Sequence, residues 1–126
     1  MRVLRSDAIG EMELSGSCAE LRELAGLLRA GAGAYALDAA ADPAPYGRAL
    51  GSVRVERTSG LVELALDADG QTLRIRGAAE SLAILAGNFE AVATEPDPHY
   101  HVHIEYFPDH MYLAETSDAL ILIADS

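Results

Sequence analysis

The fold depends most on residues 52–76, whose sequence is SVRVERTSGLVELALDADGQTLRIR. Three runs in this stretch alternate apolar and polar residues, as strands with one buried face do. These runs are residues 52–57, 61–66 and 72–76. Short connections containing Gly60 and Gly70 separate them, and short glycine-containing connections are typical of hairpins. The stretch therefore predicts a meander of three antiparallel strands.

One helix is expected before this meander. The hydroxyl of Ser17 can accept a hydrogen bond from the amide of Glu20 while the Glu20 side chain reaches back, which is the capping-box arrangement. Leucines then recur at helical spacing over residues 21–28. Because glycine favours helix ends, this helix should finish near Gly31 or Gly33.

A second helix is expected after the meander, at about residues 78–93. Its apolar stripe consists of Leu82, Leu85, Phe89 and Val92. Because proline cannot continue a helix, Pro96 and Pro98 should end it.

The remaining segments complete the predicted fold. Residues 2–14 predict one strand or two short ones, and the strictly alternating residues 100–107 predict another. Residues 119–124 are almost all apolar, which is typical of a central strand covered on both faces. Residues 33–48 are rich in Ala, Gly and Pro and predict a long loop. The order β-α-β-β-β-α-β-β favours an α+β fold, with residues 1–126 as one domain. We expect one mostly antiparallel sheet of five to six strands with two helices on a face.

Charge is distributed unevenly along the chain. Nine Arg and no Lys stand against 20 acidic residues, which gives a formal net charge of −11. Residues 77–126 contain nine of the acidic residues and none of the arginines. Such a negative field repels nucleic acids and anionic membranes and attracts cationic partners. No nucleic-acid or membrane partner is therefore expected.

Composition also bears on the compartment. Cys18 is the single cysteine, so an internal disulfide is excluded and a reducing compartment is expected. The first residues lack the apolar centre of a signal peptide, and no apolar run approaches the roughly 20 residues that span a bilayer. Arg in place of Lys, with abundant Ala and Gly, is typical of a GC-rich bacterial genome. We expect a cytoplasmic bacterial protein, either monomer or homodimer.

All four histidines of the chain fall within residues 99–110. On a strand, alternate side chains share one face. One face should then carry the polar residues His99, His101, His103 and Glu105. The other should carry the core residues Tyr100, Val102, Ile104 and Tyr106.

Three interpretations of the polar face stay open. It could be an exposed recognition surface beside the acidic field, or its side chains could simply hydrogen-bond along the sheet. It could also bind zinc, because His-x-His spacing on a strand lets two imidazoles converge on one ion. The ligands would be His101, His103, His110 and Glu105, with Glu105 as ligand or as general base of a metal-dependent hydrolase. No second His or Cys cluster supports a metal, so no cofactor is expected and binding is favoured over catalysis.

The C-terminal sequence has further residues at fixed offsets. Residues 101–113 follow the pattern HxHxEYxPxHxxL, and Ser117 and the apolar run 120–123 come after it. This pattern resembles the immunity protein 32 family of bacterial polymorphic toxin systems. The resemblance implies a small cytosolic protein, encoded beside a toxin gene, that neutralises its cognate toxin. Many such toxins are nucleases with cationic active sites, which an acidic binder would complement. The expected contact residues are His101, His103, Glu105, Asp109, His110 and Tyr112.

Overall fold

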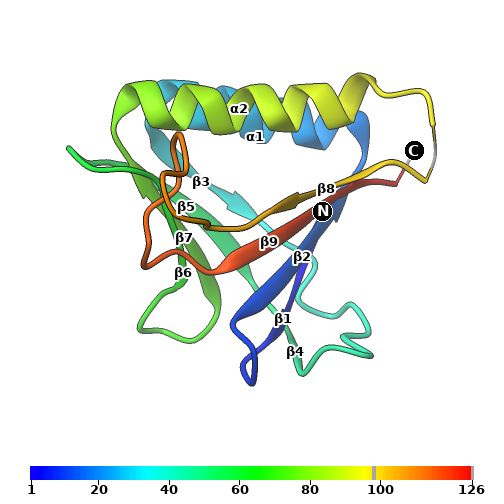
Figure 1. The fold of residues 1–126 in the computed structure, drawn as a ribbon. Coiled ribbons are helices and arrows are strands. Elements are labelled where there is room, and N and C mark those ends of the chain that lie inside the picture. The colour runs from blue at the N-terminus through cyan, green and yellow to red at the C-terminus, as the bar shows by residue number, and fades with distance from the viewer. Residues whose placement is uncertain (98, 126) are drawn as a thin grey trace.

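The computed structural model describes residues 1–97 and 99–125. Within them, two helices and nine strands form an α+β fold with two β-sheets. The two helices lie side by side across one end of the sheets (Figure 1). The prediction of an α+β fold is confirmed, whereas the prediction of a single sheet is wrong.

The first sheet has five strands in the order β4-β1-β2-β9-β8. They are β1 (Arg2–Ser6), β2 (Glu11–Gly16), β4 (Arg48–Ala49), β8 (His101–Ile104) and β9 (Ala119–Ala124). β2 and β9 run parallel, and the other neighbours run antiparallel. β1 and β2 match the expectation of two short strands near the N-terminus.

The second sheet has four strands in the order β3-β5-β7-β6. They are β3 (Ala32–Ala36), β5 (Ser52–Arg57), β6 (Glu63–Leu66) and β7 (Thr72–Gly77). The three predicted strands are present, but β5 runs parallel to β7 and has no pairing with β6. Of the predicted meander, the hairpin of β6 and β7 is confirmed, whereas the antiparallel pairing of β5 with β6 is wrong. Leu73 and Ile75 of β7 are fully buried, and the observed order places this strand, the most buried of the four, between two neighbours.

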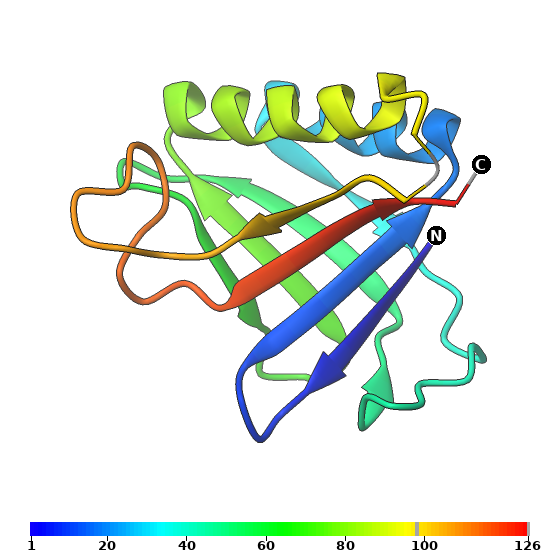
Figure 2. The ribbon, with the colours of Figure 1, turned by 45° about the vertical axis from the view of Figure 1, so that its right-hand side comes forward.

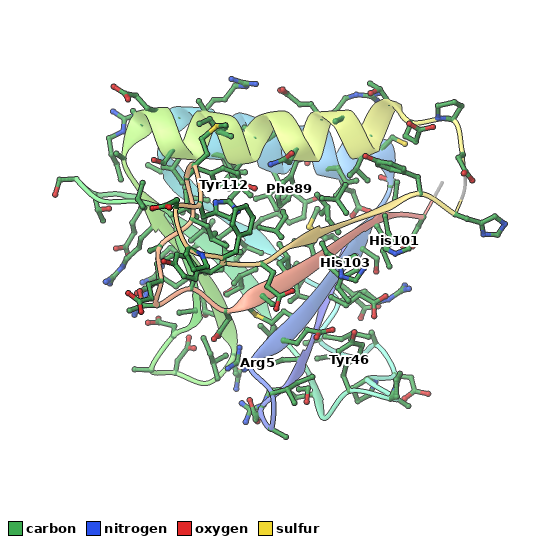
Figure 3. All side chains as sticks on the ribbon, in the orientation of Figure 1. Arg5, Tyr46, Phe89, His101, His103 and Tyr112 are labelled. Atoms are coloured by element: carbon green, nitrogen blue, oxygen red, sulfur yellow. The ribbon has the colours of Figure 1, made fainter. Side chains whose placement is uncertain are left out.

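Part of the expected loop at residues 33–48 is a strand. β3 pairs antiparallel with β5 along its whole length, so the loop prediction is wrong there. Ala and Gly have a low strand propensity. The strand conformation of β3 therefore depends on its backbone hydrogen bonds to β5 and not on its side chains. The connection that follows β3 lies near β1 and β2 (Figure 3). Burial, together with the nearby Glu13 of β2, raises the pKa of Tyr46 in this connection to about 12.

The first helix, α1 (Cys18–Ala30), has the expected capping box. Ser17 Oγ accepts a hydrogen bond from Glu20 N at 3.1 Å, and Glu20 Oε1 accepts one from Ser17 N at 2.9 Å. The helix ends at Gly31, whose φ of 73° lies in the left-handed region that favours glycine. Both predicted ends of this helix are confirmed.

The second helix, α2 (Ala79–Thr94), lies close to its predicted range. It ends before Pro96, as expected, while Pro98 lies outside the described residues. No helix in the described part of the chain is long and apolar enough to cross a membrane.

One cluster of buried side chains joins both sheets and both helices. The first sheet lies in front of the second, and the helices close one end of the space between them (Figure 2). β9 is central in that β2 and β8 flank it. Leu120 and Leu122 are buried, whereas Ile121 and Ile123 are half-buried. The expected cover on both faces is wrong, because the helices pack toward the inner faces of the sheets.

Candidate partner-binding surface

The connection from β8 to β9, residues 105–118, is called here the 105–118 segment. It runs beside β6, the edge strand of the second sheet (Figure 1). Val62, which precedes β6, donates its N–H to Tyr112 O at 2.8 Å and accepts at its own O from Ala114 N at 2.7 Å. The segment therefore joins the two sheets, and these bonds fix its backbone.

His110 holds the turn in this segment together. Its Nδ1 accepts hydrogen bonds from the amides of Tyr112 at 3.2 Å and Leu113 at 3.0 Å. Its ring also contacts the rings of Phe107 and Tyr112, with centroids 4.6 and 4.7 Å away. Burial lowers the pKa of His110, and a ring nitrogen that accepts hydrogen bonds must be unprotonated. His110 thus organises the segment and offers a partner only part of its surface.

Asp109 has a backbone conformation that is rare for a residue with a side chain. His110 N donates to Phe107 O at 3.0 Å, which closes a turn with Pro108 in its second position. Asp109 follows with a φ of 66°, as in a type II turn, where glycine is usual. The left-handed conformation costs an ordinary residue about 1–2 kcal/mol. Strain of this kind is concentrated at functional positions.

Tyr112 is packed in the core. Its side chain is 8% exposed, and its hydroxyl accepts a hydrogen bond from Asn88 Nδ2 of α2 at 2.7 Å. Tyr112 and Phe89 lie together beneath α2 (Figure 3). Sequence reasoning expected Tyr112 to contact a partner, but the structure leaves little of it available. It fastens the 105–118 segment to the helix.

His101 and His103 lie on the outer face of edge strand β8 (Figure 3). Both are exposed and their ring centroids are 5.0 Å apart, while Ile104 is buried, so the two-faced pattern is confirmed within β8. Residues at both ends of the predicted strand 100–107 lie outside β8: Tyr100, Glu105, Tyr106 and Phe107. His99, expected on the polar face, also precedes β8. The predicted strand is too long because the turn at Pro108 takes the chain away from β9 toward β6.

The four proposed zinc ligands do not form a metal site. Among residues 1–97 and 99–125, no group of three or more His, Cys, Asp or Glu side chains is placed to hold a metal ion. His101 and His103 are neighbours on β8, but His110 uses its Nδ1 to accept from backbone amides of the 105–118 segment. The metal-binding alternative therefore lacks the third ligand that it needs.

Most carboxylates of residues 77–126 form no ion pair among the described residues. Three of the nine acidic side chains there form ion pairs: Glu90 with Arg29, Asp118 with Arg5, and Asp125 with Arg2. In the part of the chain that the structure describes, no ion pair reaches the other six. These are Glu80, Glu95, Asp97, Glu105, Asp109 and Glu115. Uncompensated carboxylates attract basic partners.

A comparison with protein families connects this geometry to a known group. The family model described as immunity protein 32 matches residues 11–49 and 72–125, more than half of the chain. The chain belongs to the immunity protein 32 family. Neither a curated protein nor a solved structure matched it.

The family match bears out the resemblance seen in the C-terminal pattern of the chain. It also includes residues 11–49, so it covers β2, α1 and β3. The 105–118 segment lies wholly within the second matched range. The surface described above is therefore part of what the family model matches.

Sequence reasoning missed two exposed residues of the chain, Phe107 and Met111. Apolar residues usually predict core positions, and Phe107 also fell within the predicted strand. The neighbouring Pro108-Asp109 could have shown that the strand ends earlier, because this pair is typical of turns. Nothing in the sequence indicates that Met111 points outward while its neighbour Tyr112 points inward.

Proposed function

We propose that this immunity protein binds a polymorphic toxin of its own bacterium and neutralises it in the cytoplasm. Membership of the immunity protein 32 family is the observation that carries the proposal. The protein acts by binding, without catalysis and without a cofactor. Its partner is a protein, and it binds neither nucleic acid nor a membrane.

The charge of the chain supports a basic toxin as the partner. Six carboxylates of residues 77–126 have no ion-pair partner among the described residues, and no arginine lies in that part of the sequence. A nuclease needs a cationic surface for its substrate, and an acidic protein complements such a surface. We therefore infer a toxin of nuclease type.

The proposed contact surface combines β8 with the 105–118 segment. His101, His103, Glu105 and Asp109 are exposed and can meet the toxin directly. His110 and Tyr112 contribute mainly by fixing the segment, because His110 Nδ1 accepts a hydrogen bond from Leu113 N and the Tyr112 hydroxyl accepts one from Asn88. The immunity protein would cover the cationic site of the toxin or hold the toxin inactive.

Affinity capture tests this proposal. The tagged protein is expressed in its own host and purified at low salt, and bound proteins are identified by mass spectrometry. We expect a stoichiometric, basic C-terminal domain of a large secreted protein. That domain alone should be toxic to cells, and coexpression of the immunity protein should remove the toxicity. Failure to capture such a domain, or toxicity that persists on coexpression, contradicts the proposal.

A further inference from the structure

Two large apolar side chains project from the 105–118 segment. Phe107 is 59% exposed and Met111 is 77% exposed. Ile84 of α2, which is 39% exposed, lies one helical turn before Asn88, the residue that bonds Tyr112. Residues four apart share a helix face, so Ile84 lies on the side of α2 that meets the segment. Apolar surface from two elements therefore borders the same place.

The backbone that carries Phe107 and Met111 is fixed before any partner binds. The bond from His110 N to Phe107 O closes the turn that follows Phe107, and the two amide hydrogen bonds to His110 Nδ1 fix the chain on either side of Met111. The hydrogen bonds from Val62 N to Tyr112 O and from Ala114 N to Val62 O hold the next residues beside the start of β6. The Phe107 ring contacts the His110 ring at a centroid distance of 4.6 Å. Side chains on a fixed backbone lose less conformational entropy on binding, which favours their use as anchors.

Carboxylates without ion-pair partners lie close to these apolar residues along the chain. Glu105 and Asp109 flank Phe107, and Glu115 follows Met111 in the segment. Glu80 lies one helical turn before Ile84. An apolar centre with a polar rim is the usual arrangement of a protein–protein interface, and Phe and Met are enriched in such centres.

We propose that Phe107 and Met111 are the anchor residues of the toxin-binding surface, and that they enter an apolar depression with a basic border on the toxin. The inference rests on the proposed function and specifies the surface that performs it. Charge decides which occupant fits. A second copy of this chain would bring like charges together, whereas a basic protein satisfies both the apolar pair and its acidic rim.

Serine substitutions test the anchors. Phe107→Ser and Met111→Ser remove exposed apolar groups, and thermal unfolding should show that both variants remain folded. Ile9→Ser is the matched control, because Ile9 is 69% exposed and lies in the β1–β2 turn, away from the helices (Figure 1). The probe is the captured toxin domain, inactivated and purified. Each anchor variant should bind it roughly tenfold more weakly or worse, while the control should change by less than about twofold.

The binding measurements distinguish failure of the anchor inference from failure of the proposed function. If the native protein binds the domain and both anchor variants bind equally well, this inference is wrong and the proposed function stands. If the native protein does not bind the domain, the proposed function fails and the inference fails with it. Sedimentation of the protein alone tests the other possible occupant, a second copy of this chain. A dimer that Phe107→Ser converts to a monomer without loss of toxin affinity would assign these residues to self-association and overturn the inference.

Discussion

Asp109 is the residue at which backbone strain and charge meet. Its φ of 66° is unfavourable for any residue with a Cβ, and glycine adopts this conformation freely. We expect Asp109→Gly to raise the free energy of unfolding, by up to about 1 kcal/mol, in urea denaturation. The same substitution should weaken toxin binding, because the unpaired carboxylate is part of the proposed acidic rim.

Asp109→Asn separates the two effects. Asparagine tolerates the left-handed conformation about as well as aspartate does but carries no charge. It should leave the free energy of unfolding almost unchanged while weakening toxin binding as the glycine variant does. Should Asp109→Gly prove less stable than the native protein, the carboxylate must support the fold, and the strain would not be explained by function.

His110 makes stability depend on pH. Its pKa in the folded protein lies below the ordinary value of 6.5, so the unfolded chain binds the proton more readily. Its contribution is complete above pH 6.5 and is lost as the pH falls from 6.5 through the folded pKa. His110→Asn keeps an acceptor near the Nδ1 position but cannot titrate, so its stability should fall less between about pH 7.5 and about pH 5.

Urea unfolding of both proteins across that range is the measurement, and it compares slopes rather than absolute stabilities. His110→Ala serves as the control, since it removes both the titration and the acceptor. It should be less stable than His110→Asn at every pH. Equal slopes for the native protein and the asparagine variant would show that protonation of His110 does not oppose folding.

At the scale of single residues, the sequence predicted the exposure of the polar and charged contact residues better than that of Tyr112. His101, His103, Glu105 and Asp109 are exposed, as a contact role requires. Tyr112 is buried instead, because its hydroxyl reaches Asn88 on a helix that is distant in the sequence. The path of the 105–118 segment across β6 decides which side chains point outward, and that path depends on long-range contacts.

Among the elements, α1 offers a direct test of its start. Ser17→Ala removes the acceptor for Glu20 N and should lower the free energy of unfolding by about 1 kcal/mol. Ser17→Asp retains an acceptor at the cap and should cost much less. The midpoint of urea unfolding reports both. If the aspartate variant loses as much stability as the alanine variant, the effect is not capping but packing around Ser17.

The sequence predicted the helices well and the pairing of strands poorly. Local signals define the ends of a helix, and Ser17, Gly31 and Pro96 each supply one. Strand pairing depends on packing against neighbouring strands and on burial, which only the whole fold determines. The connection at residues 67–71 gives the expected hairpin of β6 and β7, whereas the connection at residues 58–62 does not pair β5 with β6, because β7 lies between them. β3 escaped prediction because its five residues are mostly Ala and Gly.

At the scale of the whole molecule, the two-sheet arrangement creates the proposed surface. β8 belongs to the first sheet, and the 105–118 segment runs along the second before β9 returns to the first. This path brings the exposed face of β8, the anchors Phe107 and Met111, and α2 into one region. A single sheet, as predicted from sequence, would have offered no second sheet for the segment to pair with. The uneven charge was visible in the sequence, but its position beside this segment follows from the fold.

The acidic rim should also affect how fast the protein associates with the toxin. Charge reversal of Glu105 and Asp109 to Arg in one variant should slow association by roughly tenfold at low salt, because opposite charges steer the encounter. Its association rate should also depend less on salt than that of the native protein. The matched control reverses Glu23 in α1 and Asp42 in the connection after β3, with the same change in net charge. Stopped-flow measurement of the association rates of both variants distinguishes an effect of the local acidic rim from an effect of the net charge of the whole protein. Equal slowing in both would mean that net charge alone steers the toxin, and no slowing in either would remove this surface from the encounter.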